Sequence, residues 1–384
     1  MERKYIIFGA GLYGARALEE LGSDNVECFM DNDPNKIGQL YHDKRVISPN
    51  ELRKIGEGFN IVLAGNYTLG MEQQLKELGI SNYRVYFDKK KRFYETEELI
   101  VNPYEALIEV GSEDEWINST KLKLAREDVN REAEILHGNV NLFQHIEIET
   151  INRCNGVCSF CPVNKNVDPR EKHIMSDALF YSIVDQLEEL DYDGRFTTFS
   201  NNEPLLDDRL VVFNRYARQH LKKARIHLFT NGTLMTLDLF RDLTEVLDEL
   251  IIDNYQQELK LIKPCLEIVE YCEENPELKK KVTIVLRKPQ EVLTSRGGNA
   301  PNRTRKAEYG KDKCVLPYKQ MIIRPDGKVS LCCNDATGKY TLGDVNKQTL
   351  EEIWFGPQFS KVRECLYKGR ENWGDCKYCD TFYV

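Results

Sequence analysis

The first ninety residues alternate short apolar runs with amphipathic stretches. Runs typical of buried strands occupy residues 4–8 (KYIIF), 26–30 (VECFM), 60–66 (NIVLAGN) and 83–87 (YRVYF). Segments between them, such as 71–79 (MEQQLKELG), have a helical pattern. Strands that alternate with helices, with glycines directly after the first strand, predict a doubly wound parallel sheet. The charged run DKKKR at 88–92 ends this pattern, so we assign residues 1–90 to a first domain.

A second alternating region follows. Its apolar runs are 145–150 (HIEIET), 196–200 (FTTFS), 224–230 (ARIHLFT), 249–253 (ELIID) and 281–286 (KVTIVL). Helical segments such as 176–190 (SDALFYSIVDQLEEL) separate them, which predicts a parallel half-barrel of the β/α type over residues 141–300. Residues 91–140 are rich in Glu and Lys and predict a helical connector. Residues 301–384 form a small cysteine-rich domain, and the fold class is therefore α/β.

Composition excludes several classes of protein. The 384 residues carry a formal net charge of −9, so most of the surface would repel phosphate and bulk nucleic-acid binding is not expected. The apolar run in MERKYIIFGAG is too short for a signal peptide. Nowhere do about 18 apolar residues follow one another, so no membrane segment is expected. We predict a cytoplasmic protein without a nucleic-acid or membrane partner.

Twelve cysteines call for an explanation, because disulfides are rare in a reducing compartment. Cys154, Cys158 and Cys161 form a CxxxCxxC loop directly after a predicted strand. Three thiolates at this spacing hold three irons of a [4Fe–4S] cluster and leave the fourth iron open to another ligand. Structural zinc is the alternative, although it usually takes four ligands in CxxC pairs.

With an aromatic residue, Phe160, before its third cysteine, this loop resembles the signature of the radical S-adenosylmethionine (SAM) superfamily. The resemblance implies a partial (β/α)6 barrel in which the open iron binds the amino and carboxylate groups of SAM. It also implies that an electron donor such as flavodoxin or ferredoxin reduces the cluster. SAM is then cleaved, and the resulting 5′-deoxyadenosyl radical abstracts a hydrogen atom from the substrate.

Further segments match the superfamily in order. The resemblance implies SAM contacts at Ser200, Asn201, Asn202, Glu203, Asn231, Asp253 and Arg287. Glu203 corresponds to the acid of the GGE motif and is expected to hold the methionine ammonium group. The chain departs from that motif, because Asn201 and Asn202 replace its two glycines. For Asp253 and Arg287, an ordinary surface charge is the competing interpretation.

The second cysteine group resembles the SPASM/twitch auxiliary-cluster domain of the same superfamily. The ligands implied for a second, fully ligated [4Fe–4S] cluster are Cys314, Cys332, Cys376 and Cys379. The abbreviated pattern is closest to the single-cluster twitch form of aminoglycoside-pathway dehydrogenases. Cys333 is the alternative to Cys332, and a four-cysteine zinc ribbon is the alternative metal site. Cys365 is a core residue, a further ligand or a hydrogen-atom donor.

The N-terminal domain carries a glycine motif. Gly9, Gly11 and Gly14 follow the first strand and open a helix, and Asp31 stands near the end of the second strand. Backbone N–H groups at such a turn suit a diphosphate, and the acid suits a ribose hydroxyl. A tight turn in a structural domain without a ligand is the alternative. Residues 29–52 resemble the Rossmann-like domain of sugar acyltransferases, which implies a nucleotide or nucleotide-sugar ligand.

The segment 288–313 is predicted to be a loop between the barrel and the cysteine-rich domain. Arg296, Arg303 and Arg305 are candidates to grip a phosphate group there. A solvated basic loop is the competing interpretation.

Together these features predict a radical SAM enzyme that acts on a carbohydrate or aminocyclitol, free or nucleotide-linked. If the auxiliary cluster accepts a second electron, an alcohol is dehydrogenated to a ketone. If a thiol such as that of Cys365 returns a hydrogen atom, the outcome is epimerisation. Two alternatives stay open: radical modification of a ribosomal peptide, and a non-enzymatic nucleotide-binding scaffold with structural zinc.

Overall fold

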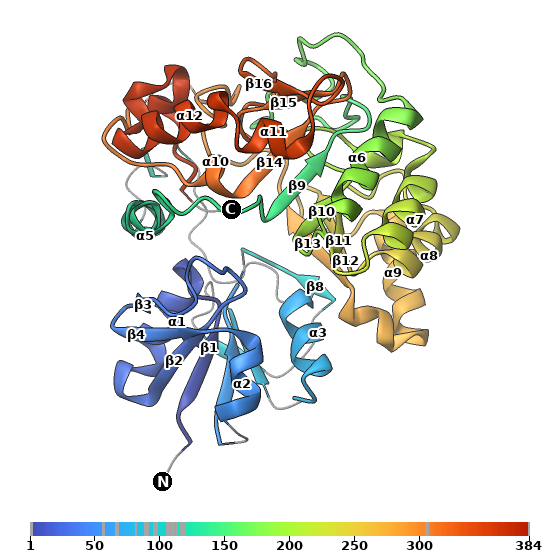
Figure 1. Cartoon of the computed structure of the whole chain (residues 1–384). Helices are drawn as coiled ribbons and strands as arrows, with labels where there is room; N and C mark the ends of the chain where they lie inside the picture. The colour runs from blue at the N-terminus through green and yellow to red at the C-terminus, as the bar shows by residue number, and fades with distance from the viewer. Residues whose placement is uncertain are drawn as a thin grey trace. The chain divides into compact units, whose positions relative to one another are not determined.

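Contacts along the chain divide the molecule into two compact units. Unit 1 comprises Met1–Glu98 and Asn102–Glu109, and unit 2 comprises Leu99–Val101 and Val110–Val384. The computed structural model describes residues 3–55, 58–65, 69–80, 83–87, 92–94, 99–104, 112, 114–115, 120–303 and 307–382. Each unit is built around its own sheet (Figure 1).

Unit 1 holds a seven-stranded sheet in the order β3-β4-β2-β1-β5-β6-β7. Its parallel strands are β1 (Tyr5–Phe8), β2 (Val26–Met30), β4 (Lys44–Ile47), β5 (Asn60–Leu63) and β6 (Tyr83–Phe87). The edges are the antiparallel strands β3 (Leu40–Tyr41) and β7 (Arg92–Tyr94). The chain starts in the middle and is wound outward in both directions, which is the order of a doubly wound sheet.

Helices cover both faces of this sheet because β1 is apolar on both sides. Ile7 packs into the cluster that contains Ala15 and Leu18 of α1 (Leu12–Leu21). Ile6 and Phe8 pack on the other face, together with residues of α2 (Pro49–Ile55) and α3 (Leu69–Glu77). The burial of both faces explains the continuous apolar run.

Unit 2 holds a nine-stranded sheet in the order β16-β15-β14-β9-β10-β11-β12-β13-β8. Its centre consists of β9 (His145–Ile148), β10 (Arg195–Thr197), β11 (Arg225–Thr230), β12 (Glu249–Tyr255) and β13 (Val282–Arg287), parallel and in chain order. These are the five strands predicted from the sequence, and the α/β fold class is confirmed.

Two further parallel strands extend this sheet in ways the sequence did not predict. β8 (Ile100–Val101), from the stretch assigned to a helical connector, pairs with β13. β14 (Gln320–Ile323), from the cysteine-rich segment, pairs with β9 and leads into the antiparallel strands β15 (Lys328–Ser330) and β16 (Thr341–Asp344). The cysteine-rich segment therefore continues the central sheet rather than forming a separate layer.

Helices pack on one face of the central strands. They are α6 (Asp177–Glu189), α7 (Leu210–His220), α8 (Leu237–Val246) and α9 (Lys263–Glu274), as Figure 1 shows. Ser176 caps α6 by accepting a hydrogen bond from the backbone N–H of Leu179, which fixes where the helix begins. The remaining helices of unit 2 are α5 (Thr120–Leu136), α10 (Leu316–Lys319), α11 (Leu350–Trp354) and α12 (Pro357–Lys368). Among the described helices, none is long and apolar enough to cross a membrane.

The other face of the central strands is concave and polar. Alternate residues such as Ile146 pack into the apolar core, so His145 and Glu147 of β9 point to the opposite face. The rings of His145 and His227 lie 5.1 Å apart although β10 separates their strands. Strands two apart are normally roughly 10 Å from each other, so the side chains converge because the sheet curves. We call this side of the sheet the concave face.

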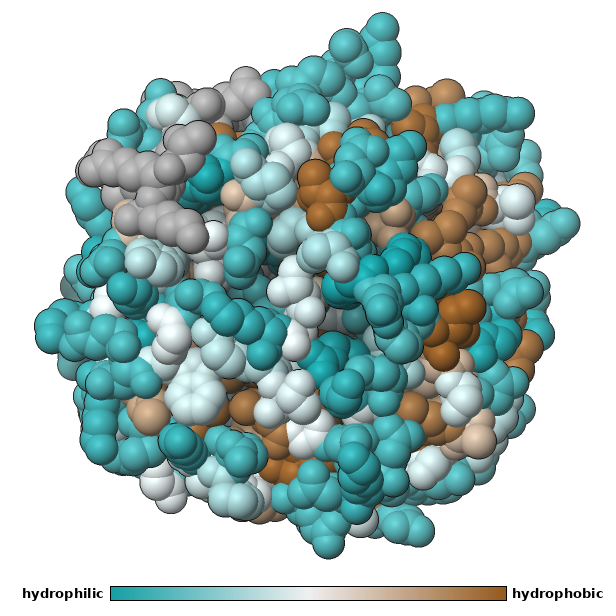
Figure 2. Space-filling view, turned by 90° about the horizontal axis from the view of Figure 1, so that it is seen from above, coloured by the Kyte–Doolittle hydropathy of each residue, from teal (hydrophilic) through white to brown (hydrophobic). Residues whose placement is uncertain are grey.

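Apolar side chains are largely withdrawn from the surface. Figure 2 shows a face on which hydrophilic residues predominate and apolar residues form small, separate patches. Most of the large apolar side chains of the described residues are buried in the cores of the two units.

The glycine turn of unit 1 supplies a stability test. A Cβ atom on Gly14 would stand 1.9 Å from the carbonyl oxygen of Gly9, whereas one on Gly11 would meet nothing within 4 Å. We expect Gly14→Ala to lower the free energy of unfolding by about 2 kcal/mol, because backbone must move to admit the methyl group. Gly11→Ala is the matched control and should change it by less than about 0.5 kcal/mol. Urea unfolding followed by circular dichroism checks this, and equal losses in the two variants would contradict it.

Candidate active site

The CxxxCxxC loop lies directly after β9, at the carboxyl end of the central strands. Its three cysteines are free thiols, and they are close enough to influence one another electrostatically. The backbone N–H and the hydroxyl of Ser159 both donate to the carbonyl of Pro289, which follows β13. On the opposite side, the side-chain amide of Asn155 donates to the hydroxyl of Thr233, which follows β11. The loop is therefore held from the ends of two other strands.

Glu203 connects these strand ends. Its carboxylate accepts hydrogen bonds from the backbone N–H of Asn231 at 2.8 Å, from the hydroxyl of Thr230 at 2.6 Å and from the backbone N–H of Leu205 at 3.1 Å. Its own N–H donates to the carbonyl of Arg153, next to the first cysteine. Burial raises the pKa of Glu203 to about 7. Since a carboxylate accepts about four hydrogen bonds, one position is left for a further donor.

Asn231 lies in the same network. Its side-chain NH₂ donates to the amide oxygen of Asn155 in the cysteine loop at 2.8 Å. Its own amide oxygen accepts from the backbone N–H and the hydroxyl of Thr233. Asn231 therefore connects the end of β11 to the cysteine loop.

The segment after β10 shows what replaces the expected glycines. The side chain of Asn201 donates to the carbonyl of Cys333 at 3.1 Å and accepts from the guanidinium of Arg296 at 3.0 Å. The amide oxygen of Asn202 accepts from the backbone N–H of Ser200. Asn202 is buried, and its side-chain NH₂ has no acceptor among the described residues. Asn201 thus ties the strand end to the cysteine-rich segment, and Asn202 offers a buried donor.

The remaining predicted SAM contacts lie at the ends of β12 and β13. The guanidinium of Arg287 faces the carboxylate of Asp253 at 3.4 Å across the two strands. Burial raises the pKa of Asp253, and Arg287 opposes that effect. The ring of Phe160 lies 6.1 Å from that of Tyr255 at the end of β12. The structure therefore brings the predicted residues from four strands to one edge of the sheet.

The donor set of this loop fits an iron–sulfur cluster. Burial raises the pKa of both Cys154 and Cys158 to about 12, and a bound metal would stabilise the thiolate form of each. The backbone N–H of Gly156 already points at the sulfur of Cys154, at 3.2 Å. In the described parts of the chain, no three His, Cys, Asp or Glu side chains converge on a single ion. Cluster ligands need not converge in this way, because each binds a different iron.

The second cysteine group comes together from distant parts of the chain. Cys332 interacts electrostatically with Cys314, Cys376 and Cys379. Burial raises the pKa of Cys314, Cys332 and Cys376. Cys333 interacts electrostatically with Glu147, Arg296 and Cys379. Cys332 therefore lies beside all three of Cys314, Cys376 and Cys379, whereas Cys379 is the one of these three thiols that acts most clearly on Cys333.

A buried arginine accompanies the second group. Arg370 is 1% exposed and donates to the carbonyls of Lys313, Cys379 and Thr381. Burial by itself would lower the pKa of Arg370, but neighbouring thiols, led by Cys314, raise it above its usual value. A guanidinium buried beside cysteines is balanced when those cysteines are thiolates, as they are when bound to a cluster. The second site therefore also fits a [4Fe–4S] cluster.

Other predicted residues are engaged elsewhere. Cys365 lies half-buried on α12, where Lys368 is its charged neighbour. Arg303 is buried and pairs with Asp380 at 3.2 Å, so its charge is used within unit 2. Arg305 lies outside the described residues.

In unit 1, Asp31 is occupied by its own chain. Its carboxylate accepts from the backbone N–H groups of Ala10 at 2.7 Å and Asp33 at 2.9 Å, and it pairs with Lys36 at 3.4 Å. Gly9 has a φ of +116° at the same turn. These contacts brace the glycine turn from within the chain.

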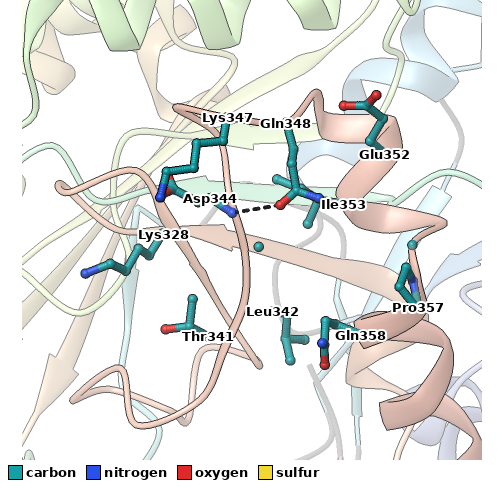
Figure 3. A pocket seen from close by; sticks show the side chains of 12 residues that line it. Lys328, Thr341, Leu342, Asp344, Lys347, Gln348, Glu352, Ile353, Pro357 and Gln358 are labelled. Carbon is teal, nitrogen blue, oxygen red and sulfur yellow. Dashed lines mark hydrogen bonds and ion pairs between the residues drawn. The ribbon is translucent and has the colours of Figure 1, made fainter.

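A separate pocket of about 580 Å³ lies in the cysteine-rich segment. Figure 3 shows it between the β15–β16 hairpin and the helices α11 and α12, with the backbone N–H of Asp344 donating to the side chain of Gln348. None of the predicted site residues lines it. It is therefore distinct from the site at the strand ends.

Comparisons with known families agree with this geometry. The model described as "Radical SAM superfamily" matches residues 148–257, and the model described as "Iron-sulfur cluster-binding domain" (SPASM) matches residues 314–380. The chain therefore contains a radical SAM domain and a SPASM domain. Its cofactors are therefore SAM and [4Fe–4S] clusters, as predicted. A third model, "C2185-like, N-terminal", matches residues 1–86.

Individual relatives match a little under two thirds of the chain. The chain is 28% identical over 245 residues to an S-adenosyl-L-methionine-dependent 2-deoxy-scyllo-inosamine dehydrogenase of Niallia circulans, covering 63% of this chain and 95% of the relative. It is also similar to the crystal structure of BtrN in complex with AdoMet and 2-DOIA, with a TM-score of 0.54 and 27% identity over 63% of this chain and 94% of that one.

Several residues that build the radical SAM site escaped the sequence analysis. Asn155 and Thr233 form the loop's second anchor, and Arg370 accompanies the second cysteine group. Glu147 lies on the concave face near Cys333. A signal for Glu147 does exist, because in HIEIET the polar residues alternate with isoleucines and so share one face of the strand.

The buried arginine leads to a test of the second cluster. We expect Arg370→Met to reduce iron from about eight to about four atoms per chain, because the charge that balances the thiolates is lost. Iron analysis and electron paramagnetic resonance of anaerobically prepared protein measure this. Arg363→Met is the control, since Arg363 is an equally buried arginine that donates to the carbonyls of Pro317 and Trp354. Full iron content in Arg370→Met would contradict the assignment.

Proposed function

We propose that this radical SAM enzyme dehydrogenates one hydroxyl-bearing carbon of an aminocyclitol or a similar amino sugar. The proposal is supported by the segment after β10, which touches both cysteine groups. Asn201 donates to the carbonyl of Cys333, and Glu203 donates its backbone N–H to the carbonyl of Arg153, next to Cys154. A small polyhydroxylated molecule on the concave face would lie near both clusters. The dehydrogenase of Niallia circulans, named for an aminocyclitol, supports the same substrate class.

When bound, SAM and its cluster supply a radical that removes a hydrogen atom from carbon, and the auxiliary cluster supplies an acceptor for the second electron. The chain's own residues bind SAM and orient it. Glu203 offers its remaining acceptor position to the methionine ammonium group, and Asn202 offers its buried NH₂ to the carboxylate of SAM. Asp253 and Arg287 line the same edge, on the side suited to the ribose.

The reaction removes a hydrogen atom, a proton and an electron from a secondary alcohol and leaves a ketone. A flavodoxin- or ferredoxin-type protein is the electron donor we assign to the first cluster. No step requires a nucleotide in unit 1, where Asp31 holds the glycine turn through its own hydrogen bonds.

Anaerobic incubation with SAM, a reductant and 2-deoxy-scyllo-inosamine tests the proposal. We expect 5′-deoxyadenosine and a ketone in equal amounts, because each turnover removes one hydrogen atom. Formation of 5′-deoxyadenosine that no aminocyclitol or amino sugar increases would contradict the substrate class.

The same assay in D₂O separates dehydrogenation from epimerisation. We expect the ketone and no solvent deuterium in recovered substrate at the reacting carbon, since no thiol returns a hydrogen atom there. An epimer that carries one deuterium at that carbon would contradict dehydrogenation. Mass spectrometry of the products distinguishes the two outcomes.

A further inference from the structure

Glu147 is a buried carboxylate that is not among the residues assigned to SAM or to either cluster. It lies on the concave face of β9 and is 7% exposed. Its Oε2 atom accepts a hydrogen bond from the hydroxyl of Ser200 at 2.7 Å. Ser200 belongs to the segment that also carries Glu203, so the contact fixes the carboxylate relative to the SAM-binding edge.

The charge of Glu147 lacks a dedicated partner. Among the described residues, no lysine or arginine lies within ion-pair distance of it. His145 is 3.7 Å away, but burial lowers the pKa of His145 to about 3, so its ring is neutral near pH 7. Arg195 is paired with Glu249 at 3.0 Å, and Arg296 donates to Asn201.

Burial without such a partner raises the pKa of Glu147 to about 7, although Ser200 and the two arginines oppose the effect. A buried carboxylate is expensive unless it is paired, and a cation placed beside it removes that cost. The cation that the site lacks is therefore best supplied by a ligand.

The residues around Glu147 indicate where such a ligand would bind. Cys333, next to the auxiliary ligand Cys332, interacts electrostatically with Glu147. Asn201, next to Ser200, donates to the carbonyl of Cys333. Glu147 thus lies where the SAM-binding edge and the auxiliary-cluster segment meet.

On this basis, which rests on the proposed function, we propose that Glu147 binds the ammonium group of the amino-substituted substrate, with Ser200 holding the carboxylate in place. An alkyl amine is protonated near neutral pH, as lysine is. Its charge-assisted hydrogen bond to Glu147 is stronger than a bond from a neutral hydroxyl. Glu147 therefore makes the enzyme specific for amino-substituted rings.

Isothermal titration calorimetry tests this with the anaerobic full-length protein that carries both clusters and SAM. The two probes are 2-deoxy-scyllo-inosamine and the cyclitol with a hydroxyl in place of its amino group. We expect wild type to bind the amine roughly 10- to 100-fold more tightly. In Glu147→Gln, which keeps the shape and an acceptor for Ser200, the preference should fall to less than about twofold.

Glu249→Gln is the matched control, because Glu249 is a buried carboxylate on the same face that Arg195 already pairs. It should keep the preference for the amine. Ser200→Ala should reduce the preference partially, and it provides a second variant if Glu147→Gln does not fold.

The outcomes separate this inference from the proposed function. Equal binding of both probes by wild type, or a preference that survives in Glu147→Gln, overturns the role of Glu147 alone. Binding of neither probe by wild type overturns the proposed function and the inference with it.

Discussion

The carboxylate of Glu203 is the contact on which the rest of the site depends. It accepts hydrogen bonds from Thr230 and Asn231 at the end of β11, and the backbone N–H of the same residue donates to the carbonyl of Arg153 beside the first cysteine. Glu203 therefore links the segment after β10 both to the end of β11 and to the residue before the cysteine loop. The geometry of three thiols around a cluster is therefore set by hydrogen bonds between neighbouring strands of one parallel sheet, which is where parallel sheets carry their sites.

The same sheet explains how two cysteine groups serve one substrate. β14 pairs with β9, so the cysteine-rich segment begins as a strand of the sheet that carries the first group. Cys333 and Glu147 consequently come together although they are distant in sequence. The concave face carries the buried carboxylate of Glu147 at this point, where we propose that it binds a cation.

The sequence predicted those site residues that come directly after a strand. The CxxxCxxC loop, Glu203 and Asn231 were predictable because each stands at the end of an apolar run, and such ends meet at one edge. The strand β14 was not, because four residues after a short helix carry no signal for pairing with a strand far away. The sequence also could not predict that the Asp31 carboxylate accepts hydrogen bonds from backbone N–H groups of its own turn. A ribose contact would need the same carboxylate at the same position.

We infer that Cys154, Cys158 and Cys161 hold a cluster with one iron open to SAM. Electron paramagnetic resonance of the reduced protein, recorded before and after SAM is added, tests it most directly. We expect SAM to alter the signal of one cluster and to leave the other unchanged, and we expect Cys158→Ser to remove the responsive signal. A spectrum that SAM leaves unaltered, or a responsive signal that persists in Cys158→Ser, would contradict it.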